Sequence, residues 1–290
     1  YRNMLFTSPG ISDYISGVIL FDETIRQTNN EGVPFPEYLT SLGIVPGIKV
    51  DKGAKELAAC QGEKVTEGLD GLRERLNEYY ALGARFAKWR AVITIGNGIP
   101  SDTCISVNAH ALARYSALVQ ESGMVPIVEP EVLMDGVHSL DTCFQVTAKV
   151  LDVVFSELND QKVVLNGIIL KPNMVISGTD ANNRADVATV ASATVDCLTS
   201  HVPNEVPGIA FLSGGQTSEE ATAHLSAMNE LGPHPWQLSF SYGRALQASP
   251  LKVWDGHEKN LEAAQTEFLK RSRLNGLART GNYNTQMELV

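Results

Sequence analysis

The chain lacks the residue patterns that bind metals or build disulfide frameworks. Its four cysteines are far apart and form no CxxC pair, and its six histidines show neither HxH nor HxxxH spacing. We therefore expect no dedicated metal site, and reduced thiols rather than disulfides, as is usual in the cytosol. The four thiols are those of Cys60, Cys104, Cys143 and Cys197.

Long apolar stretches and basic regions are also missing. No run reaches membrane-spanning length, and the opening YRNMLFTSPG has neither region of a secretory signal. The net charge of −10 argues against general nucleic-acid binding. We expect no membrane or nucleic-acid partner and a cytoplasmic location, or a plastid if a transit peptide preceded Tyr1. The absence of an initiator Met indicates a fragment or a processed form.

What the chain does contain is a regular alternation. Seven short apolar runs are separated mostly by segments with helical spacing, which predicts crossover units and a parallel sheet. No Gly-rich linker divides the chain, so we expect one domain over residues 1–290, with a C-terminal helix and tail at 258–290. The apolar runs are 17–21, 43–50, 86–95, 125–133, 167–173, 208–215 and 238–244, and the clearest helical segments are 68–84, 109–123, 139–160 and 217–232.

A doubly wound sheet and a (β/α)8 TIM barrel both fit this alternation. Polar residues gather at the C-terminal ends of the runs, where barrels build their sites, and this favours the barrel. Only seven of the eight strands are evident, and YRNMLF at the start is typical of a helix. We therefore expect the first strand upstream of Tyr1, which would leave unpaired edges at runs 17–21 and 238–244.

The strand ends carry charged residues on shared faces. Side chains two apart in a strand point the same way, which pairs Lys88 with Arg90 and Glu129 with Glu131. Lys49 and Asp51 are paired by the same spacing. If these faces line the barrel, they form a cationic mouth suited to a substrate with more than one phosphate. The expected rim contains Lys49, Lys88, Arg90, Glu129, Glu131, Lys171 and Arg244.

Two further motifs suit phosphate binding. In LSGGQTSEE, Ser213, Gly214 and Gly215 lie just before a predicted helix, where backbone N–H groups and the helix dipole favour an anion. SFSYGRA places Ser241, Gly243 and Arg244 at the end of the last run. Loops after the last two strands of such barrels often bind phosphate.

Each signal also has an ordinary explanation. Lys88 and Arg90 alone would suit an exposed edge strand, VEPE a polar loop, and GGQ or SYG a simple turn. Lys171, which ends the apolar run GIIL, could be a surface lysine, a paired lysine or a reactive one. Their placement at equivalent ends of consecutive runs favours a common site.

Six motifs resemble those of one enzyme family in order and spacing. They are GIKVDKG, FAKWR, VPIVEPE, ILKPNMV, LSGGQ and SYGRALQ, and the similarity runs from about Gly17 to past Leu261. The chain thereby resembles class I fructose-1,6-bisphosphate aldolase. The resemblance implies a metal-independent, homotetrameric barrel enzyme that reversibly cleaves fructose 1,6-bisphosphate to dihydroxyacetone phosphate and glyceraldehyde 3-phosphate.

The resemblance also implies roles for individual residues. Lys171 matches the lysine that forms a Schiff base with the substrate ketone, and burial beside other cations would make its amine nucleophilic. Glu129 would transfer protons, while Glu131 and Lys88 would orient groups and tune charge. Positions for the C1 phosphate match Ser213, Gly214, Ser241, Gly243 and Arg244, and positions near the C6 phosphate match Lys49 and Arg90.

The chain departs from the family pattern at both ends. The aspartate of the family's first strand has no counterpart here, and the chain stops at NYNTQMELV with Tyr283 near the end but not terminal. Two other functions remain as alternatives: a Schiff-base lyase for another phosphorylated sugar, and a scaffold or binding protein that keeps the fold without turnover. The intact Lys171 and Glu129 and the two phosphate motifs favour the aldolase.

Overall fold

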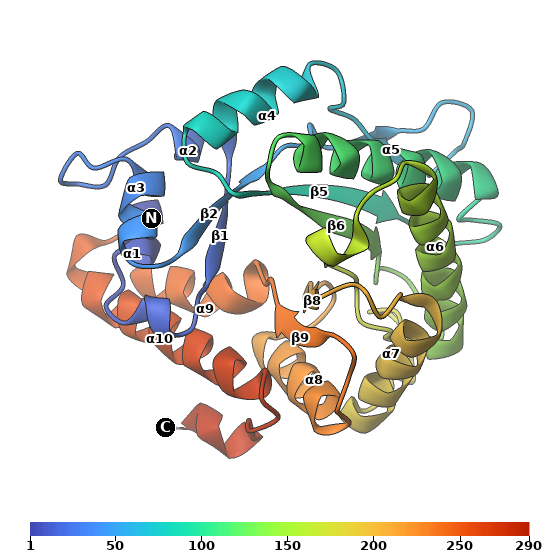
Figure 1. Ribbon diagram of the computed structural model, residues 1–290. Helices are drawn as coiled ribbons and strands as arrows, with labels where there is room; N and C mark the ends of the chain where they lie inside the picture. Colours follow the sequence, from blue (N-terminus) through green and yellow to red (C-terminus); the bar gives the residue numbers. More distant parts are fainter. Residues whose placement is uncertain (290) are drawn as a thin grey trace.

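Parallel strands form the inner wall of the molecule. In the computed structural model, which describes residues 1–289, seven of them curl around a common axis with helices outside (Figure 1). Their spatial order follows the sequence, and all neighbours are parallel, as right-handed strand–helix crossovers produce. The strands are β1 (Gly17–Leu20), β2 (Val45–Lys49), β5 (Phe86–Ile93), β6 (Val125–Val132), β7 (Ile169–Leu170), β8 (Gly208–Phe211) and β9 (Gln237–Phe240).

Helices cover the outside of this wall. A long helix follows each of β5 to β9, which confirms the predicted barrel class. The 109–123 segment begins earlier than expected because the Ser101 side chain caps the helix by accepting from the Cys104 N–H. The helices are α1 (Arg2–Phe6), α2 (Asp22–Ile25), α3 (Phe35–Ser41), α4 (Leu72–Ala81), α5 (Asp102–Glu121), α6 (Leu140–Asp160), α7 (Val187–His201), α8 (Ser218–Glu230), α9 (Arg244–Trp254) and α10 (Leu261–Ala278), with short 3-10 turns at Ile11–Asp13, Leu165–Gly167, Glu258–Asn260 and Thr285–Leu289.

A small antiparallel hairpin was not expected from the sequence. It consists of β3 (Ala54–Glu56) and β4 (Lys64–Thr66) and interrupts the connection between β2 and α4. The buried Asn108 of α5 holds it by accepting from the Thr66 N–H and donating to the Lys64 carbonyl. The buried Glu63 accepts from the N–H and hydroxyl of Ser101. The hairpin is therefore fastened to the start of α5.

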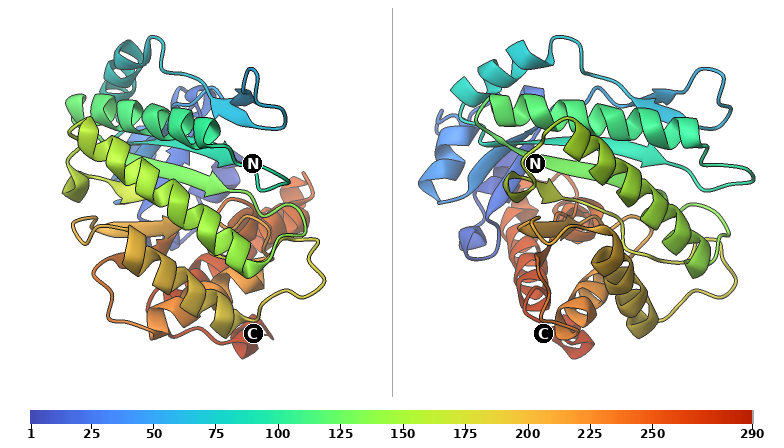
Figure 2. Two further views of the ribbon diagram at one scale, coloured as in Figure 1. Left: turned by 90° about the vertical axis from the view of Figure 1, so that its right-hand side faces the viewer. Right: turned by 45° about the vertical axis from the view of Figure 1, so that its right-hand side comes forward.

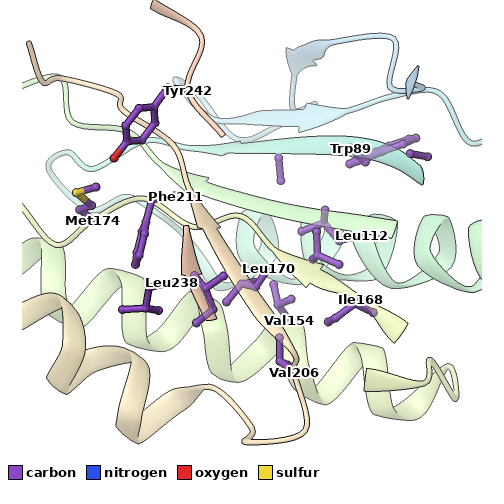
Figure 3. Packing of buried hydrophobic residues seen from close by; sticks show 14 of the residues in the cluster. Trp89, Leu112, Val154, Ile168, Leu170, Met174, Val206, Phe211, Leu238 and Tyr242 are labelled. Atoms are coloured by element: carbon purple, nitrogen blue, oxygen red, sulfur yellow. The ribbon is translucent and has the colours of Figure 1, made fainter. Parts of the chain in front are cut away.

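The hydrophobic core lies between strands and outer helices. Trp89 and Leu170 from the strands belong to the same buried cluster as Leu112 of α5 and Val154 of α6 (Figure 3). The fully buried Tyr115 of α5 donates to carbonyls of both β5 and β6. Because side chains alternate along a strand, burial of Trp89 on the helix side turns its two sequence neighbours toward the barrel axis.

The ends of the curled sheet are β1 and β9, as predicted from the two runs. Within residues 1–289 no strand pairs with their outer edges. Helices α9 and α10 lie across this side, and the C-terminal turn packs near α8 (Figures 1 and 2). No helix in this described part is long and apolar enough to cross a membrane.

Candidate active site

Two neighbouring strands supply the centre of the site. The register sets Arg90 of β5 beside Glu129 of β6, and inward side chains pair across the strands. Lys88 Nζ lies 3.1 Å from Glu129 Oε2, and Arg90 forms an ion pair with Glu131. The predicted shared faces are therefore present, and both point into the barrel.

Lys171 enters the same space from the end of β7. The backbone N–H of Lys171 donates to the carbonyl of Val128. The next residue, Pro172, uses its carbonyl to accept a hydrogen bond from the N–H of Leu212. The backbone is thus held from both neighbouring strands at the point where the apolar run stops. The Lys171 amine lies 3.1 Å from Glu129 Oε1, and the residue is only 8% exposed.

The environment of Lys171 favours its neutral form. Burial lowers the pKa of the amine most strongly, because a charged group loses hydration. The positive charge of Lys88 lowers this pKa further, whereas Glu129 and Glu131 oppose the shift. The net direction is downward, which increases the fraction of nucleophilic amine near neutral pH.

Charges of alternating sign run from Lys171 to Lys49. Glu129 lies between Lys171 and Lys88, and Asp51 lies between Lys88 and Lys49. Asp51 Oδ2 is 3.6 Å from Lys88 Nζ, and Asp51 Oδ1 is 2.6 Å from Lys49 Nζ. The sequence paired Asp51 with Lys49 by spacing but did not predict it as a member of the site. Its contact with Lys88 depends on the pairing of β2 with β5.

The rim is less cationic than the sequence predicts. Five cations face three carboxylates, so the formal excess is two positive charges, and four of the five cations are engaged in ion pairs. Arg244 is exposed, and its side chain makes no hydrogen bond or ion pair to another side chain within residues 1–289. Within the same residues no group of three or more His, Cys, Asp or Glu side chains is placed to hold a metal ion.

The loop after β8 holds the first phosphate motif. Gly214 lies against the site, because a Cβ there would stand 3.2 Å from Glu131 Oε1. The contribution of the helix dipole stays a prediction. Helix α8 begins at Ser218, a capping box of Thr217 and Glu220 engages the N–H groups of these two residues, and two glutamates occupy the first turn. The capping box and the glutamates make this helix end less suited to an anion than an uncapped one.

The loop after β9 holds the second phosphate motif and a more suitable helix end. The Ser241 N–H donates to the Phe211 carbonyl at the end of β8, so the two loops are adjacent. Gly243 is the N-cap of α9 and provides no side-chain cap, and Arg244 is the first residue of that helix. An uncapped helix N-terminus beside an unpaired arginine suits a phosphate.

Fold and site together define a (β/α)-barrel protein with a buried lysine held among carboxylates. Comparisons with known proteins specify the family. The family model for class I fructose-bisphosphate aldolase matches residues 1–289. The chain belongs to this family, whose members act through a lysine Schiff base without a metal cofactor.

Individual relatives agree with this assignment. The chain is 60% identical to the probable fructose-bisphosphate aldolase class 1 of Xanthomonas axonopodis pv. citri, covering 98% of this chain and 85% of the relative. It is 50% identical to cytosolic fructose-bisphosphate aldolase 4 of Arabidopsis thaliana, covering 99% and 74%. It also resembles the crystal structure of Plasmodium falciparum fructose-bisphosphate aldolase in complex with TRAP and a small-molecule inhibitor. That match has a TM-score of 0.96 and 49% identity, covering 98% of this chain and 82% of the other.

Proposed function

We propose that this chain catalyses the reversible cleavage of fructose 1,6-bisphosphate into dihydroxyacetone phosphate and glyceraldehyde 3-phosphate. The observation that carries the proposal is the position of Lys171. Its amine is buried at the C-terminal end of a barrel strand, within 3.1 Å of a carboxylate that also contacts Lys88. Membership of the class I family supplies the reaction and the substrate class.

Lys171 is the nucleophile in this proposal. Lys171 passes its ammonium proton to Glu129, and the resulting neutral amine adds to the C2 ketone. One proton moves from the nitrogen to the former ketone oxygen, Glu129 returns its proton to the resulting hydroxyl, which leaves as water, and a cationic iminium results. When the C3–C4 bond breaks, its electron pair moves toward the iminium to give an enamine, while the C4 hydroxyl loses its proton and becomes an aldehyde. Protonation of the enamine at C3 and hydrolysis release the second product and restore Lys171.

The phosphates are assigned to opposite sides of the barrel mouth. Ser213, Gly214, Gly215, Ser241, Gly243 and Arg244 bind the C1 phosphate in this proposal. Lys49 and Arg90 bind near the C6 phosphate. Lys49 and Arg90 already form ion pairs with carboxylates, so each would contact the phosphate while it keeps its carboxylate partner.

The wider setting is proposed on the same basis. We infer a single domain, a homotetramer and a cytoplasmic location. The tetramer follows from the family resemblance. The location is supported by relatives from Arabidopsis thaliana and Spinacia oleracea that are named cytosolic or cytoplasmic isozymes.

Borohydride trapping tests the proposal directly. Sodium borohydride with dihydroxyacetone phosphate should reduce the iminium and leave one modified peptide, which contains Lys171. Lys171→Met should abolish both trapping and turnover. Lys149→Met, which changes an exposed lysine on α6, should leave both unchanged. Modification of a different lysine, or an unmodified chain that keeps its fold, would refute the assignment.

A further inference from the structure

Asp51 is a buried anion with an unusual number of partners. It lies two positions after the last residue of β2, and its side chain is only 3% exposed. The backbone N–H of Gly53 donates to one carboxylate oxygen and that of Arg90 to the other. These two hydrogen bonds fix the position of the carboxylate charge independently of Lys49 and Lys88.

Lys88 lies between this anion and Glu129. Its amine is 3.6 Å from Asp51 and 3.1 Å from Glu129, and its side chain is 9% exposed. The contact with Glu129 Oε2 is ionic, because that oxygen accepts no hydrogen bond within residues 1–289. A lysine has a long flexible stem, so one ion pair alone would restrain it weakly. The second carboxylate on the opposite side prevents the amine from turning away.

We infer that Asp51 is a positioning residue that holds Lys88 against Glu129 and thereby sets the charge beside Lys171. The inference rests on the proposed role of Lys171. Asp51 does not touch the reacting amine. It acts through Lys88, whose positive charge lowers the pKa of Lys171 and whose ion pair orients Glu129. Lys49, on the other side, is held by the same carboxylate.

The decisive variant is Asp51→Asn, which keeps the size of the side chain and one acceptor oxygen but removes the charge. The matched control is Glu63→Gln. Glu63 is another buried acid of the connection between β2 and α4, and its hydrogen bonds go to Ser101 rather than to a lysine. Asp51→Asn should lower kcat for fructose 1,6-bisphosphate about tenfold, because a misplaced proton-transfer group is costly. KM should change less than about threefold, because no C1-phosphate residue contacts Asp51 and, of the two residues assigned to the C6 phosphate, only Lys49 loses its ion-pair partner.

A second measurement separates positioning from structural support. The pH at which borohydride trapping with dihydroxyacetone phosphate is half-maximal should rise in Asp51→Asn. Without Asp51 the Lys88 amine can turn away from Lys171, whose pKa its positive charge lowers, while Glu129 and Glu131, which raise that pKa, stay in place. Asp51→Glu, which restores the charge on a longer stem, should return the midpoint to the wild-type value and recover part of kcat. Glu63→Gln should leave the midpoint unchanged.

Failures of the two proposals are distinguishable. If the wild-type chain is not trapped at Lys171, the proposed function fails. If the wild type is trapped but Asp51→Asn keeps its kcat and its midpoint, the positioning role is wrong. The positioning role is also wrong if Tm, kcat and KM change by the same amounts in Asp51→Asn and in Glu63→Gln. Should Asp51→Asn not fold, a displaced trapping midpoint in Asp51→Glu would refute the role.

Discussion

Two walls of the barrel hold their polar groups in opposite ways. On the β5–β6–β7 wall, every lysine and arginine of the site is matched by a carboxylate, and Lys88, Glu129 and Lys171 are buried. On the β8–β9 wall, the candidate phosphate groups are serines, glycines and one unpaired arginine, all at least partly exposed. In the proposed function the first wall transfers protons, which requires charge positions that are fixed beforehand. In the proposed function the second wall receives a phosphate, and none of the residues assigned to that phosphate is a carboxylate.

Loss of a charge from the first wall should have the largest effect. Glu129→Gln removes the anion that contacts both Lys88 and Lys171. We expect kcat to fall by about a hundredfold or more, as for other proton-transfer groups. Steady-state kinetics and circular dichroism measure this, with Glu121→Gln on the surface of α5 as control. A kcat within about twofold of wild type would remove Glu129 from the mechanism.

A change on the second wall should affect binding rather than chemistry. Arg244→Ala removes the unpaired guanidinium at the start of α9, and binding should weaken by about 2–3 kcal/mol if one charge-assisted contact is lost. Titration of dihydroxyacetone phosphate against the Lys171→Met variant measures this without turnover. Lys252→Ala, at the other end of the same helix, is the control. Equal affinity in both variants would contradict the phosphate role.

The pH dependence of trapping tests the charge balance of the first wall. Because the pKa of Lys171 is lowered, its neutral amine persists to a lower pH than that of an ordinary lysine with a pKa of 10.5. The trapping rate should rise with pH and reach half its maximum below 10.5. Measurement of the rate across this range, with the fold checked at each pH, gives the midpoint. A midpoint at or above the ordinary value would show that the carboxylates outweigh burial.

The smallest effect should come from the capping box of α8. Thr217→Ala removes the hydroxyl that accepts from the Glu220 N–H and should destabilise the protein by about 1 kcal/mol. We expect KM for fructose 1,6-bisphosphate not to change, because the capping box already engages two of the N–H donors at this helix end. Denaturant unfolding measures the change in stability, and steady-state kinetics on the same preparation measures KM. A marked rise in KM would show that the N-terminus of α8 contributes to phosphate binding.

The sequence predicted the site best where the signal is local. Alternation along β5 and β6 was enough to place Lys88, Arg90, Glu129 and Glu131 on inner faces, because that pattern needs only the geometry of single strands. Membership of Asp51 was missed because it depends on the register of Lys49 with Lys88, a contact between distant segments.

Other differences have equally physical reasons. Helix α7 was not among the clearest helical segments of the sequence, since its start VATVASATV is rich in β-branched residues that give a weak helical signal. The strands of the hairpin at β3 and β4 are three residues long and mostly polar, which is too short for a pattern. The contribution of the α8 dipole to phosphate binding stays a prediction, and the capping box of Thr217 and Glu220 leaves fewer N–H donors for an anion at this helix end.

The alternating charges from Lys171 to Lys49 also bear on how this site can evolve. Loss of any one inner member deprives each neighbouring charge of one of its counter-ions, and an under-compensated buried charge destabilises a fold more than joint loss of both partners. Single substitutions at Asp51, Lys88 or Glu129 therefore pass through an unfavourable intermediate. Drift in this part of the barrel is expected to require paired replacements, whereas a replacement in the loops after β8 and β9 leaves no buried ion pair broken.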